Sequence, residues 1–495
     1  MLDLLTVRPV SEHEVEDAVQ TAAVAPFRLE TDLPLRAHLF TTEPGQHVFV
    51  VVLHHIAGDG WSVGPLAADL AAAYAARLHD QAPRWSALPV QYADYTLWQQ
   101  NVLGDENDTG SVISGQVDYW REQLAELPEE LSLPTDRPRP VESSYKGGWV
   151  DLTIDAELHA RLTTLAAAHG VSMFMLTQTA LALLLSKLGA GTDIPIGSPI
   201  AGRTDQALDD LIGFFVNTLV LRTDLSGDPT FAELLGRVRE TNLDAHAHQD
   251  VPFERLVEIL NPERSLARHP LFQVMLVFQN ATTASLDLSG LEVGGYSTGT
   301  GTTKFDLTWG LNELYSTDGR PGGISGIVEY STDLYDATTI TTLITRFVQL
   351  LDDLARTPDQ TLATLSILTQ SERELLESWN DTAVDVPVGT VGEVFERQAG
   401  ITPDAVAVIS GEEQISYAEL EARANRLAHL LIEQGVGPER VVALSMPRGI
   451  DMITAVLGVL KAGGAYLPVD PTYPAERRQY MLDDAQPVIV LDALP

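Results

Sequence analysis

The chain contains 495 residues, which is more than one hydrophobic core normally supports and predicts about two to four domains. Its 69 acidic and 31 basic side chains give a formal net charge of -38, which argues against binding of nucleic acids or anionic membranes because such a surface repels phosphate groups. The absence of cysteine excludes disulfides, thiolate zinc sites and a cysteine nucleophile.

The N-terminal region predicts a helix, two strands and a second helix. Residues 1–25 are expected to form one helix, and β-like runs follow at 35–40 and 47–54, around a Pro-Gly turn. The apolar run 48–53 is continuous, which predicts a central strand buried on both faces. Apolar residues then recur at helical spacing over 63–78, which predicts an amphipathic helix.

No segment reads as a secretion signal or a membrane span. The segment 1–17 is acidic and lacks a basic start followed by an apolar core, so no signal peptide is expected. The most apolar stretches are either too short to span a bilayer, as in 48–53, or interrupted by polar residues, as in 174–188. We therefore expect a soluble, cytoplasmic protein.

The middle of the chain predicts a second α/β region. Residues 101–116 are expected to form a loop or crossover, residues 134–140 form a second break, and the new region starts near Trp149. Alternating helices and strands in two successive regions predict two sandwiched α/β lobes. The expected helices are 157–168, 172–188 (after a stop at Gly170), 230–247 and 336–355, and the expected strands are 192–199, 216–224, 271–279, 304–314 and 323–330.

Residues 358–387 are expected to form a linker with one short helix at 371–379. After this linker the α/β pattern starts again. The expected elements are a helix at 391–399, a strand at 405–410, a helix at 417–434, a strand at 440–445 and a helix at 450–462.

The only tight cluster of titratable groups on an apolar scaffold is His54, His55 and Asp59, at the end of a predicted strand. Adjacent strand residues point to opposite faces, so one histidine is expected to face a cavity and the other the packed interior. A neutral imidazole in a cavity can accept a proton near neutral pH. Asp59 could pair with an arginine or hold the turn shut, and Gly60 allows a close backbone approach.

Other interpretations of these residues stay open on this evidence. A single histidine on a strand is usually structural, and a metal site built from His54, His55 and Asp59 is disfavoured because adjacent strand residues diverge. A second group, His246, His248 and Asp250, ends a predicted helix and is interpreted as a solvated or capping set. The sequence contains no Gly-x4-Gly-Lys-Ser/Thr phosphate loop and no Gly-x-Gly-x-x-Gly fingerprint.

The wider context of the histidine pair resembles one enzyme family. The run LHHIAGDGWS at 53–62 resembles the active-site motif of nonribosomal peptide synthetase condensation domains. Further matches follow in the order of the family's motifs, and together they make a specific signal. These matches are YADYTLWQ at 92–99, IGFFVNTL at 212–219 with Arg222, HQDVPFERLV at 248–257, and the segment 264–279.

The C-terminal part resembles a different domain of the same synthetases. ISYAEL at 415–420 and LKAGGAYLPVD at 460–470 resemble the first two motifs of amino-acid adenylation domains. A condensation domain followed by an adenylation domain is the order expected in a peptide-elongating module.

The resemblance implies an α/β fold with two chloramphenicol acetyltransferase-like lobes, followed by the N-terminal α/β part of an adenylate-forming domain. Neither of the two motifs that precede the double-histidine motif in the family is found, so the first lobe is expected to be incomplete. The adenylation part is expected to stop before its ATP-phosphate loop. The implied domains are the remainder of the first lobe at 1–133, the second lobe at 134–357, a linker at 358–386 and an adenylation fragment at 387–495.

The resemblance also implies a reaction, in which an aminoacyl thioester attacks an acyl or peptidyl thioester to form a peptide bond. His55 is then the catalytic residue, and His54, Asp59 and Gly60 support it. The implied partners are upstream and downstream peptidyl carrier domains bearing 4'-phosphopantetheine, and the adjoining adenylation domain. No metal is implied for condensation, and ATP with magnesium is expected only for a complete adenylation domain.

Within the family, Trp61 and the run GFFVNT at 213–218 most resemble the subtype that joins two L-residues. The alternatives are a truncated, non-catalytic remnant that only binds carrier proteins and, less favoured, an epimerisation domain, which shares the double-histidine motif. A cyclisation domain is disfavoured because it would carry paired aspartates in place of that motif.

Overall fold

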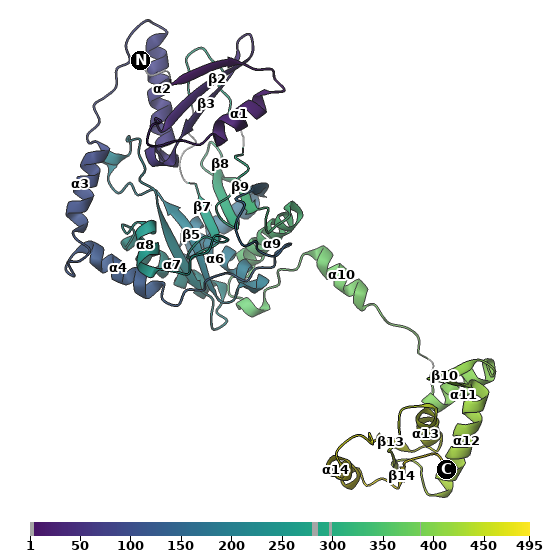
Figure 1. Cartoon of the computed structure of the whole chain (residues 1–495). Helices are drawn as coiled ribbons and strands as arrows, with labels where there is room; N and C mark the ends of the chain where they lie inside the picture. Colours follow the sequence, from purple (N-terminus) through teal and green to yellow (C-terminus); the bar gives the residue numbers. More distant parts are fainter. Residues whose placement is uncertain (1–3, 280–285, 297–298, 387) are drawn as a thin grey trace. The chain divides into compact units, whose positions relative to one another are not determined.

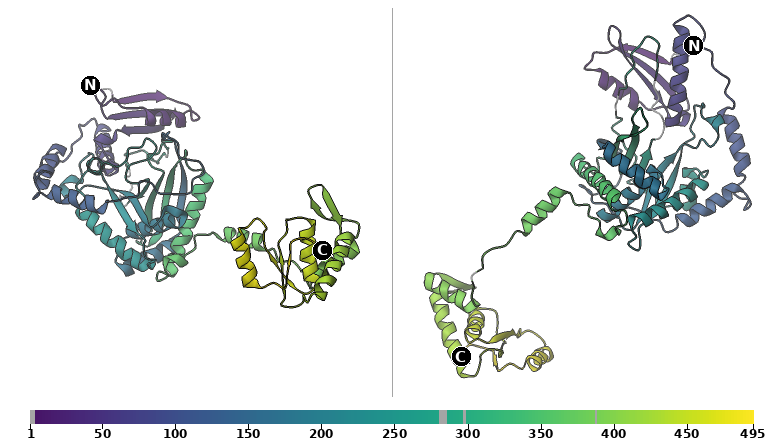
Figure 2. Two further views of the ribbon diagram at one scale, coloured as in Figure 1. Left: turned by 60° about the horizontal axis from the view of Figure 1, so that its bottom comes forward. Right: turned by 180° about the vertical axis from the view of Figure 1, so that it is seen from behind.

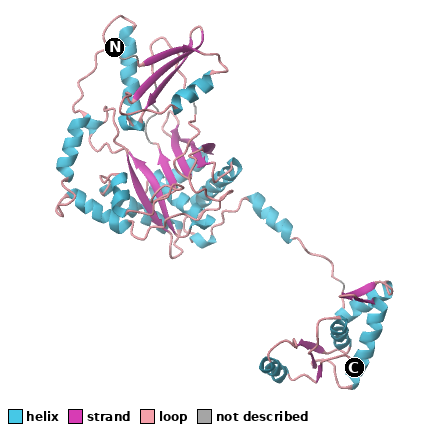
Figure 3. Ribbon diagram, viewed as in Figure 1, coloured by secondary structure: helices cyan, strands magenta, loops and turns pink. Residues whose placement is uncertain are grey.

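The computed structural model describes residues 4–279, 286–296, 299–386 and 388–495. The chain divides into two units, the first up to Leu376 and the second from Glu377 onwards (Figure 1). Both units mix helices and strands, as Figure 3 shows by colour, so the predicted α/β class is confirmed.

The first lobe of the first unit is a three-stranded sheet covered by a helix. Its strands lie in the order β1-β2-β3, with β1 parallel and β3 antiparallel to β2. Side chains of α1 pack with Phe40 of β2 to form a small core. The elements of this lobe are β1 (Leu5–Pro9), α1 (Val15–Val24), β2 (Leu35–Glu43), β3 (Gln46–Leu53) and α2 (Val63–Arg77).

Two expectations for this lobe were wrong. Residues 1–25 do not form one helix, because 5–9 pair with β2 as a parallel strand and the helix begins only at Val15. The apolar strand β3 is not central either. Within the described residues it pairs only with β2, and Phe49 and Val51 are exposed. A continuous apolar run therefore did not distinguish an edge strand from a buried one.

Two helices connect the lobes where a loop was expected at 101–116. They are α3 (Tyr92–Leu103) and α4 (Val112–Gln123), so only the segment 104–111 lies outside helices. Gly104 ends α3 with a positive φ of 78°, and the Ser111 side chain accepts a hydrogen bond from the Ser114 amide at the start of α4. The polar composition of this stretch thus reflects two helix caps around a short loop.

The second lobe contains a six-stranded sheet in the order β4-β9-β8-β7-β5-β6. All neighbouring pairs are antiparallel except β5–β7 and β7–β8. The two sheets of the first unit are separate in each view (Figure 2). The strands are β4 (Gly147–Ile154), β5 (Asp193–Ile200), β6 (Asn217–Asp224), β7 (Val274–Phe278), β8 (Leu307–Tyr315) and β9 (Pro321–Ser331).

Helices of the second lobe pack against alternate residues of this sheet, such as Leu307, Trp309 and Leu311 of β8, and form the main core. The strands and helices predicted for this region are confirmed to within a few residues. Gly170 ends the first helix in the left-handed conformation, as its position predicted. The helices are α5 (Ala156–His169), α6 (Met173–Leu185), α7 (Phe231–Ala247), α8 (Phe253–Leu260) and α9 (Ala337–Arg356).

Among the described residues, one helical stretch, Met173–Ala190, is long and apolar enough to cross a membrane. Its central side chains, from Leu176 to Leu185, are instead buried in the core of the second lobe. Length and composition therefore do not distinguish this core helix from a membrane span, whereas its packing does.

The helix α10 (Gln370–Asn380) spans the boundary between the two units, and the predicted alternation of helices and strands in the second unit is confirmed. This unit contains a parallel sheet in the order β13-β12-β14 and a separate two-stranded antiparallel pair, β10-β11. The elements are α11 (Val391–Ile401), β10 (Val406–Ser410), β11 (Glu413–Ser416), α12 (Tyr417–Glu433), β12 (Val441–Leu444), α13 (Ile450–Lys461), β13 (Ala465–Pro468), α14 (Ala475–Ala485) and β14 (Ile489–Leu491).

Candidate active site

The two adjacent histidines lie just beyond the end of β3. The strand ends at Leu53, His54 caps a short 3-10 helix, and His55 is the first residue of that helix. Strand alternation was expected to separate the two side chains, but this explanation was wrong because neither histidine belongs to the strand. The side chains do have different surroundings, but the turn creates the difference.

The His54 side chain makes its hydrogen bond and its ring contact with nearby residues of the first lobe. Its Nδ1 accepts a hydrogen bond from the Ile56 amide at 3.1 Å, which caps the 3-10 helix. Its ring meets Phe27 edge-on, with centroids 5.8 Å apart. Because Nδ1 is an acceptor, the neutral ring carries its proton on Nε2. His54 therefore stabilises the turn.

The His55 side chain is exposed and contacts the second lobe. Its ring lies 5.0 Å from the ring of Phe214, centroid to centroid, with the two planes at 78°. Phe214 belongs to the loop that precedes β6, so the contact joins residues far apart in the sequence. The histidine at the end of the first lobe is thus placed against the second lobe.

Asp59 is 5% exposed and uses both carboxylate oxygens. Oδ1 accepts hydrogen bonds from the amide of Ser62 at 3.0 Å and from its hydroxyl at 2.9 Å. Oδ2 accepts from the amide of Phe215 at 3.0 Å. The guanidinium of Arg203 lies 3.4 Å from Oδ1 and 4.2 Å from the centre of the Phe215 ring. Asp59 therefore ties the turn to the second lobe.

Ser62 extends the same network. Its hydroxyl lies 2.9 Å from the carbonyl oxygen of Gly213 and accepts a hydrogen bond from the Gly213 amide at 3.1 Å. The Asp-x-x-Ser spacing of Asp59 and Ser62 is that of a capping pair, a sequence signal that could have identified Ser62. Arg203 lies 144 positions from Asp59, and no local pattern indicated the pairing.

Gly60 was expected to allow a close backbone approach. This expectation was wrong for approach by the described residues of this chain. A Cβ atom at Gly60 would meet no atom within 4 Å. The close approach occurs instead at Gly58, where a Cβ would lie 2.4 Å from the Leu53 side chain. A side chain at Gly58 would therefore require the Leu53 side chain to shift.

The second histidine group is a solvated and capping set, as interpreted, because His246 is exposed and His248 caps a helix, and it also contributes packing contacts. His248 caps the C-terminus of α7, its ring stacks on Tyr119 at 3.9 Å, and its carbonyl oxygen accepts a hydrogen bond from the indole of Trp120 at 2.7 Å. The Asp250 carboxylate accepts from the Gln116 side chain at 2.7 Å. His246 bonds to its own helix, at the Asn242 carbonyl. This group fixes α4 to the second lobe.

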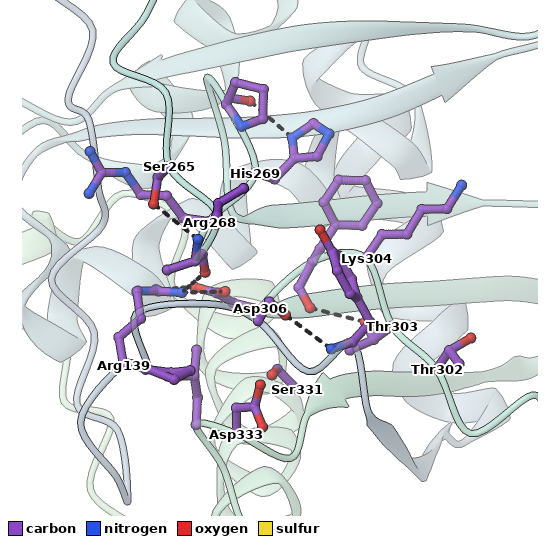
Figure 4. Close-up of a pocket in the computed structure, with 18 residues that line it drawn as sticks. Arg139, Ser265, Arg268, His269, Thr302, Thr303, Lys304, Asp306, Ser331 and Asp333 are labelled. Carbon is purple, nitrogen blue, oxygen red and sulfur yellow. Dashed lines mark hydrogen bonds and ion pairs between the residues drawn. The ribbon is translucent and has the colours of Figure 1, made fainter.

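A pocket of about 520 Å³ lies within the second lobe, and it contains none of the predicted site residues (Figure 4). Arg139 and Asp306 face each other there and form a two-pronged ion pair at 2.9 and 2.5 Å, which raises the pKa of Arg139. Burial lowers the pKa of His269 to about 4, so this histidine is neutral at pH 7. Its Nδ1 donates to the Pro270 carbonyl at 2.9 Å. Neither the ion pair nor His269 offers an acid or base suited to neutral pH.

Across the described ranges, no group of three or more His, Asp or Glu side chains could hold a metal ion. His54, His55 and Asp59 in particular have different partners: a backbone amide, an aromatic ring and the Ser62–Arg203 network.

Comparison with known proteins identifies both parts of the chain. Residues 2–377 match the family model described as Condensation domain, and residues 395–494 match the model described as AMP-binding enzyme. A dimodular nonribosomal peptide synthase of Bacillus subtilis (strain 168) is 50% identical over 488 residues. That alignment covers 98% of this chain but only 20% of the relative, so the chain spans about a fifth of the relative's length.

Solved structures that resemble this chain also come from nonribosomal peptide synthesis. The X-domain from teicoplanin biosynthesis, in complex with OxyB, is 38% identical, with a TM-score of 0.69 over 74% of this chain and 80% of that chain. A four-domain nonribosomal peptide synthetase bound to AMP and glycine aligns over 99% of this chain and 37% of its own length. Its TM-score is 0.78 at 24% identity, which shows a shared fold.

Proposed function

Because the chain belongs to the condensation-domain family of the nonribosomal peptide synthetases, we propose that it forms peptide bonds in nonribosomal peptide biosynthesis. The donor is an acyl or peptidyl thioester and the acceptor is an aminoacyl thioester. Each is carried on the 4'-phosphopantetheine arm of a carrier domain.

The reaction is aminolysis of a thioester. The acceptor amine attacks the donor carbonyl, a C–N bond replaces the C–S bond, and the amine proton leaves while the donor thiol is released. An α-amino group has a pKa of about 7.7–8.0, so a useful fraction is already neutral near pH 7. His55 hydrogen-bonds the amine and accepts its proton as the bond forms, a role that typically contributes about 10²–10⁴-fold.

One observation supports this assignment of His55: it alone of the predicted cluster has an exposed side chain. His54 is bonded to the Ile56 amide, and Asp59 is buried in the network with Ser62 and Arg203. We therefore assign His55 the catalytic role and His54 and Asp59 the role of holding the turn that carries it. Gly60, where a Cβ would meet no atom within 4 Å, is assigned the supporting role of keeping the turn free of a side chain at that position.

The proposed partners are the upstream and downstream peptidyl carrier domains and the adenylation domain that 395–494 begins to form. We place the reaction in the cytoplasm and assign 134–357 to the second lobe and 358–386 to the linker. ATP and magnesium belong to adenylation. Because no cluster of described side chains fits a magnesium site, no step is assigned to them here.

The test compares His55→Ala with Asp59→Ala in a condensation assay with loaded donor and acceptor carriers. His55→Ala is expected to slow turnover by about 10²–10⁴-fold with an unchanged melting temperature. Asp59→Ala removes a buried carboxylate and leaves Arg203 without its counter-charge, so we expect a loss of stability of about 3 kcal/mol or more. His79→Ala, an exposed histidine after α2, is the control and should change neither quantity.

Unchanged turnover of His55→Ala at saturating carriers would contradict the catalytic role. A fully stable Asp59→Ala variant would contradict the structural role of that carboxylate.

A binding platform without catalysis is the second candidate. The observation that favours it is the 38% identical X-domain, whose structure was solved in complex with OxyB. The same assay separates the two candidates: carrier binding without product formation by the unaltered protein would support the platform.

A further inference from the structure

We propose that Phe214 is a positioning residue for His55, a role that rests on the proposed condensation activity. The ring of Phe214 holds the imidazole in one orientation against the second lobe. Phe214 itself touches no reacting atom in this proposal and acts only through His55.

The ring contact is what orients His55. The two centroids lie 5.0 Å apart with planes at 78°, the edge-to-face arrangement that aromatic rings prefer. In the part of the chain that the structure describes, no hydrogen bond to the His55 imidazole is found, in contrast to His54 with its bond to the Ile56 amide. Without the Phe214 ring, the exposed imidazole would be free to change rotamer.

Phe214 can impose an orientation because its own backbone is held on both sides. Its carbonyl oxygen accepts a hydrogen bond from the Tyr92 hydroxyl at 2.6 Å. The Gly213 amide before it donates to Ser62, and the Phe215 amide after it donates to Asp59. All three bonds involve the backbone of this loop, so they leave the Phe214 side chain available to contact His55.

The fit is tight around this loop. A Cβ atom at Gly213 would lie 2.5 Å from the Tyr92 ring and 2.8 Å from that of Phe215, so there is no room for a side chain. The network that begins at Asp59 thus continues through Gly213 and Phe215 to the ring beside His55. Asp59 supports the catalytic histidine through Phe214 as well as through the turn.

An alternative role for Phe214 is purely structural. Its ring is 38% exposed and also lines a pocket of about 170 Å³ with Tyr95 and Trp98. The test must therefore distinguish loss of a pocket wall from loss of orientation at His55, and a spectroscopic signal from His55 does so.

The experiment uses Phe214→Leu, which removes the ring but keeps apolar bulk and every backbone hydrogen bond. Phe214→Tyr keeps the ring and serves as the conservative variant. Phe49→Leu is the matched control, because Phe49 is 39% exposed and lies on β3 of the lobe that carries His55. The full chain is labelled with ¹³C-histidine, and the His55 Cε1–H signal is assigned from its absence in His55→Gln.

We expect Phe214→Leu to remove the ring-current shift of the His55 signal and to lower kcat by about tenfold, with KM for both carriers unchanged within about twofold. Phe214→Tyr should retain the shift and the rate, and Phe49→Leu should alter neither.

An unchanged His55 signal in Phe214→Leu would overturn the proposal, as would a shifted signal with an unchanged kcat. A rise in KM with kcat intact would assign Phe214 to substrate binding and also overturn it. Failure of the unaltered protein to form product would contradict the proposed function instead, while the NMR comparison would still decide whether the two rings are in contact.

Discussion

His269 illustrates, at the scale of one residue, how packing sets the charge of a side chain. Its ring lies among the rings of Phe253, Phe272 and Phe305, with centroids 4.7–5.6 Å apart across the cluster. Burial there lowers its pKa to about 4 from the ordinary value of 6.5. Near neutral pH the folded chain therefore keeps this histidine uncharged.

This depressed pKa predicts a pH-dependent stability. As the pH falls from about 6.5 towards 4, unfolded His269 takes up a proton and folded His269 does not, so protons favour unfolding. Between pH 7 and pH 5, the unfolding free energy of the unaltered protein should fall by about 2 kcal/mol more than that of His269→Gln. Denaturant unfolding at the two pH values measures this difference. His13→Gln, at an exposed histidine, should show no such difference, and equal pH dependence in His269→Gln would contradict the assignment.

At the same scale, the sequence indicated which side chains of the candidate site matter but not how they are held. The unusual grouping of His54, His55 and Asp59 was visible as a pattern. The partners of Asp59 were not, because Arg203 and Phe215 are brought to it only by folding. The roles assigned to His55 and Asp59 stay predictions for the assays described above.

At the scale of an element, two glycines share the same backbone conformation but are needed for different reasons. Gly170 has a φ of 63° and Gly202 a φ of 64°. Gly170 ends α5, and a Cβ there would meet no atom within 4 Å. A Cβ at Gly202 would lie 1.9 Å from the carbonyl oxygen of Phe215. Only the second glycine is required for close packing as well as for conformation.

This difference gives a paired prediction. Gly170→Ala should destabilise the first unit by about 1 kcal/mol, the usual cost of a left-handed alanine. Gly202→Ala should cost at least about 2 kcal/mol more, since the backbone of Phe215 must move and Phe215 donates to Asp59. Denaturant unfolding followed by tryptophan fluorescence reports on this unit, because Trp120 and Trp309 are buried there. Equal losses in the two variants would contradict the proposed clash.

Periodicity predicted the helices and strands that have an apolar pattern of their own. It missed features that depend on pairing with another strand. The helices and strands of the second lobe from residues 157 to 355 were predicted, except the short helix α8. The strand β1 was missed because its five residues become a strand only by pairing with β2. The exposure of β3 was missed because an apolar run does not show how many neighbours a strand has.

At the scale of the whole molecule, an accessible segment follows α10, close to the boundary between the two units. Residues 381–386 have no regular structure, and the side chains of Val384, Val386 and Val388 are exposed. Val141 is similarly exposed, but nearby residues are tied down: the Ser143 amide bonds to the Leu266 carbonyl and the Ser144 amide to Asp333. Exposure alone therefore does not make two segments equally accessible to a protease.

Limited digestion with elastase, which cleaves after small apolar residues, is expected to cut at 384–388 well before it cuts at Val141. Each product should remain folded, because each unit has a core of its own. Mass spectrometry identifies the cut, and circular dichroism of the separated products tests their folding. First cleavage at Val141, or unfolding of the products, would contradict this expectation.

The sequence by itself determined the α/β class, the order of most elements, the family and the residues of the candidate site. These properties are carried by local spacing and by motifs that lie within a few residues of one another. Only the tertiary structure decided that Arg203 pairs with Asp59, that Phe214 meets His55 and that β3 lies at an edge. Each of these joins segments far apart in the chain, or depends on which strands pair, and such contacts leave no periodicity in the sequence.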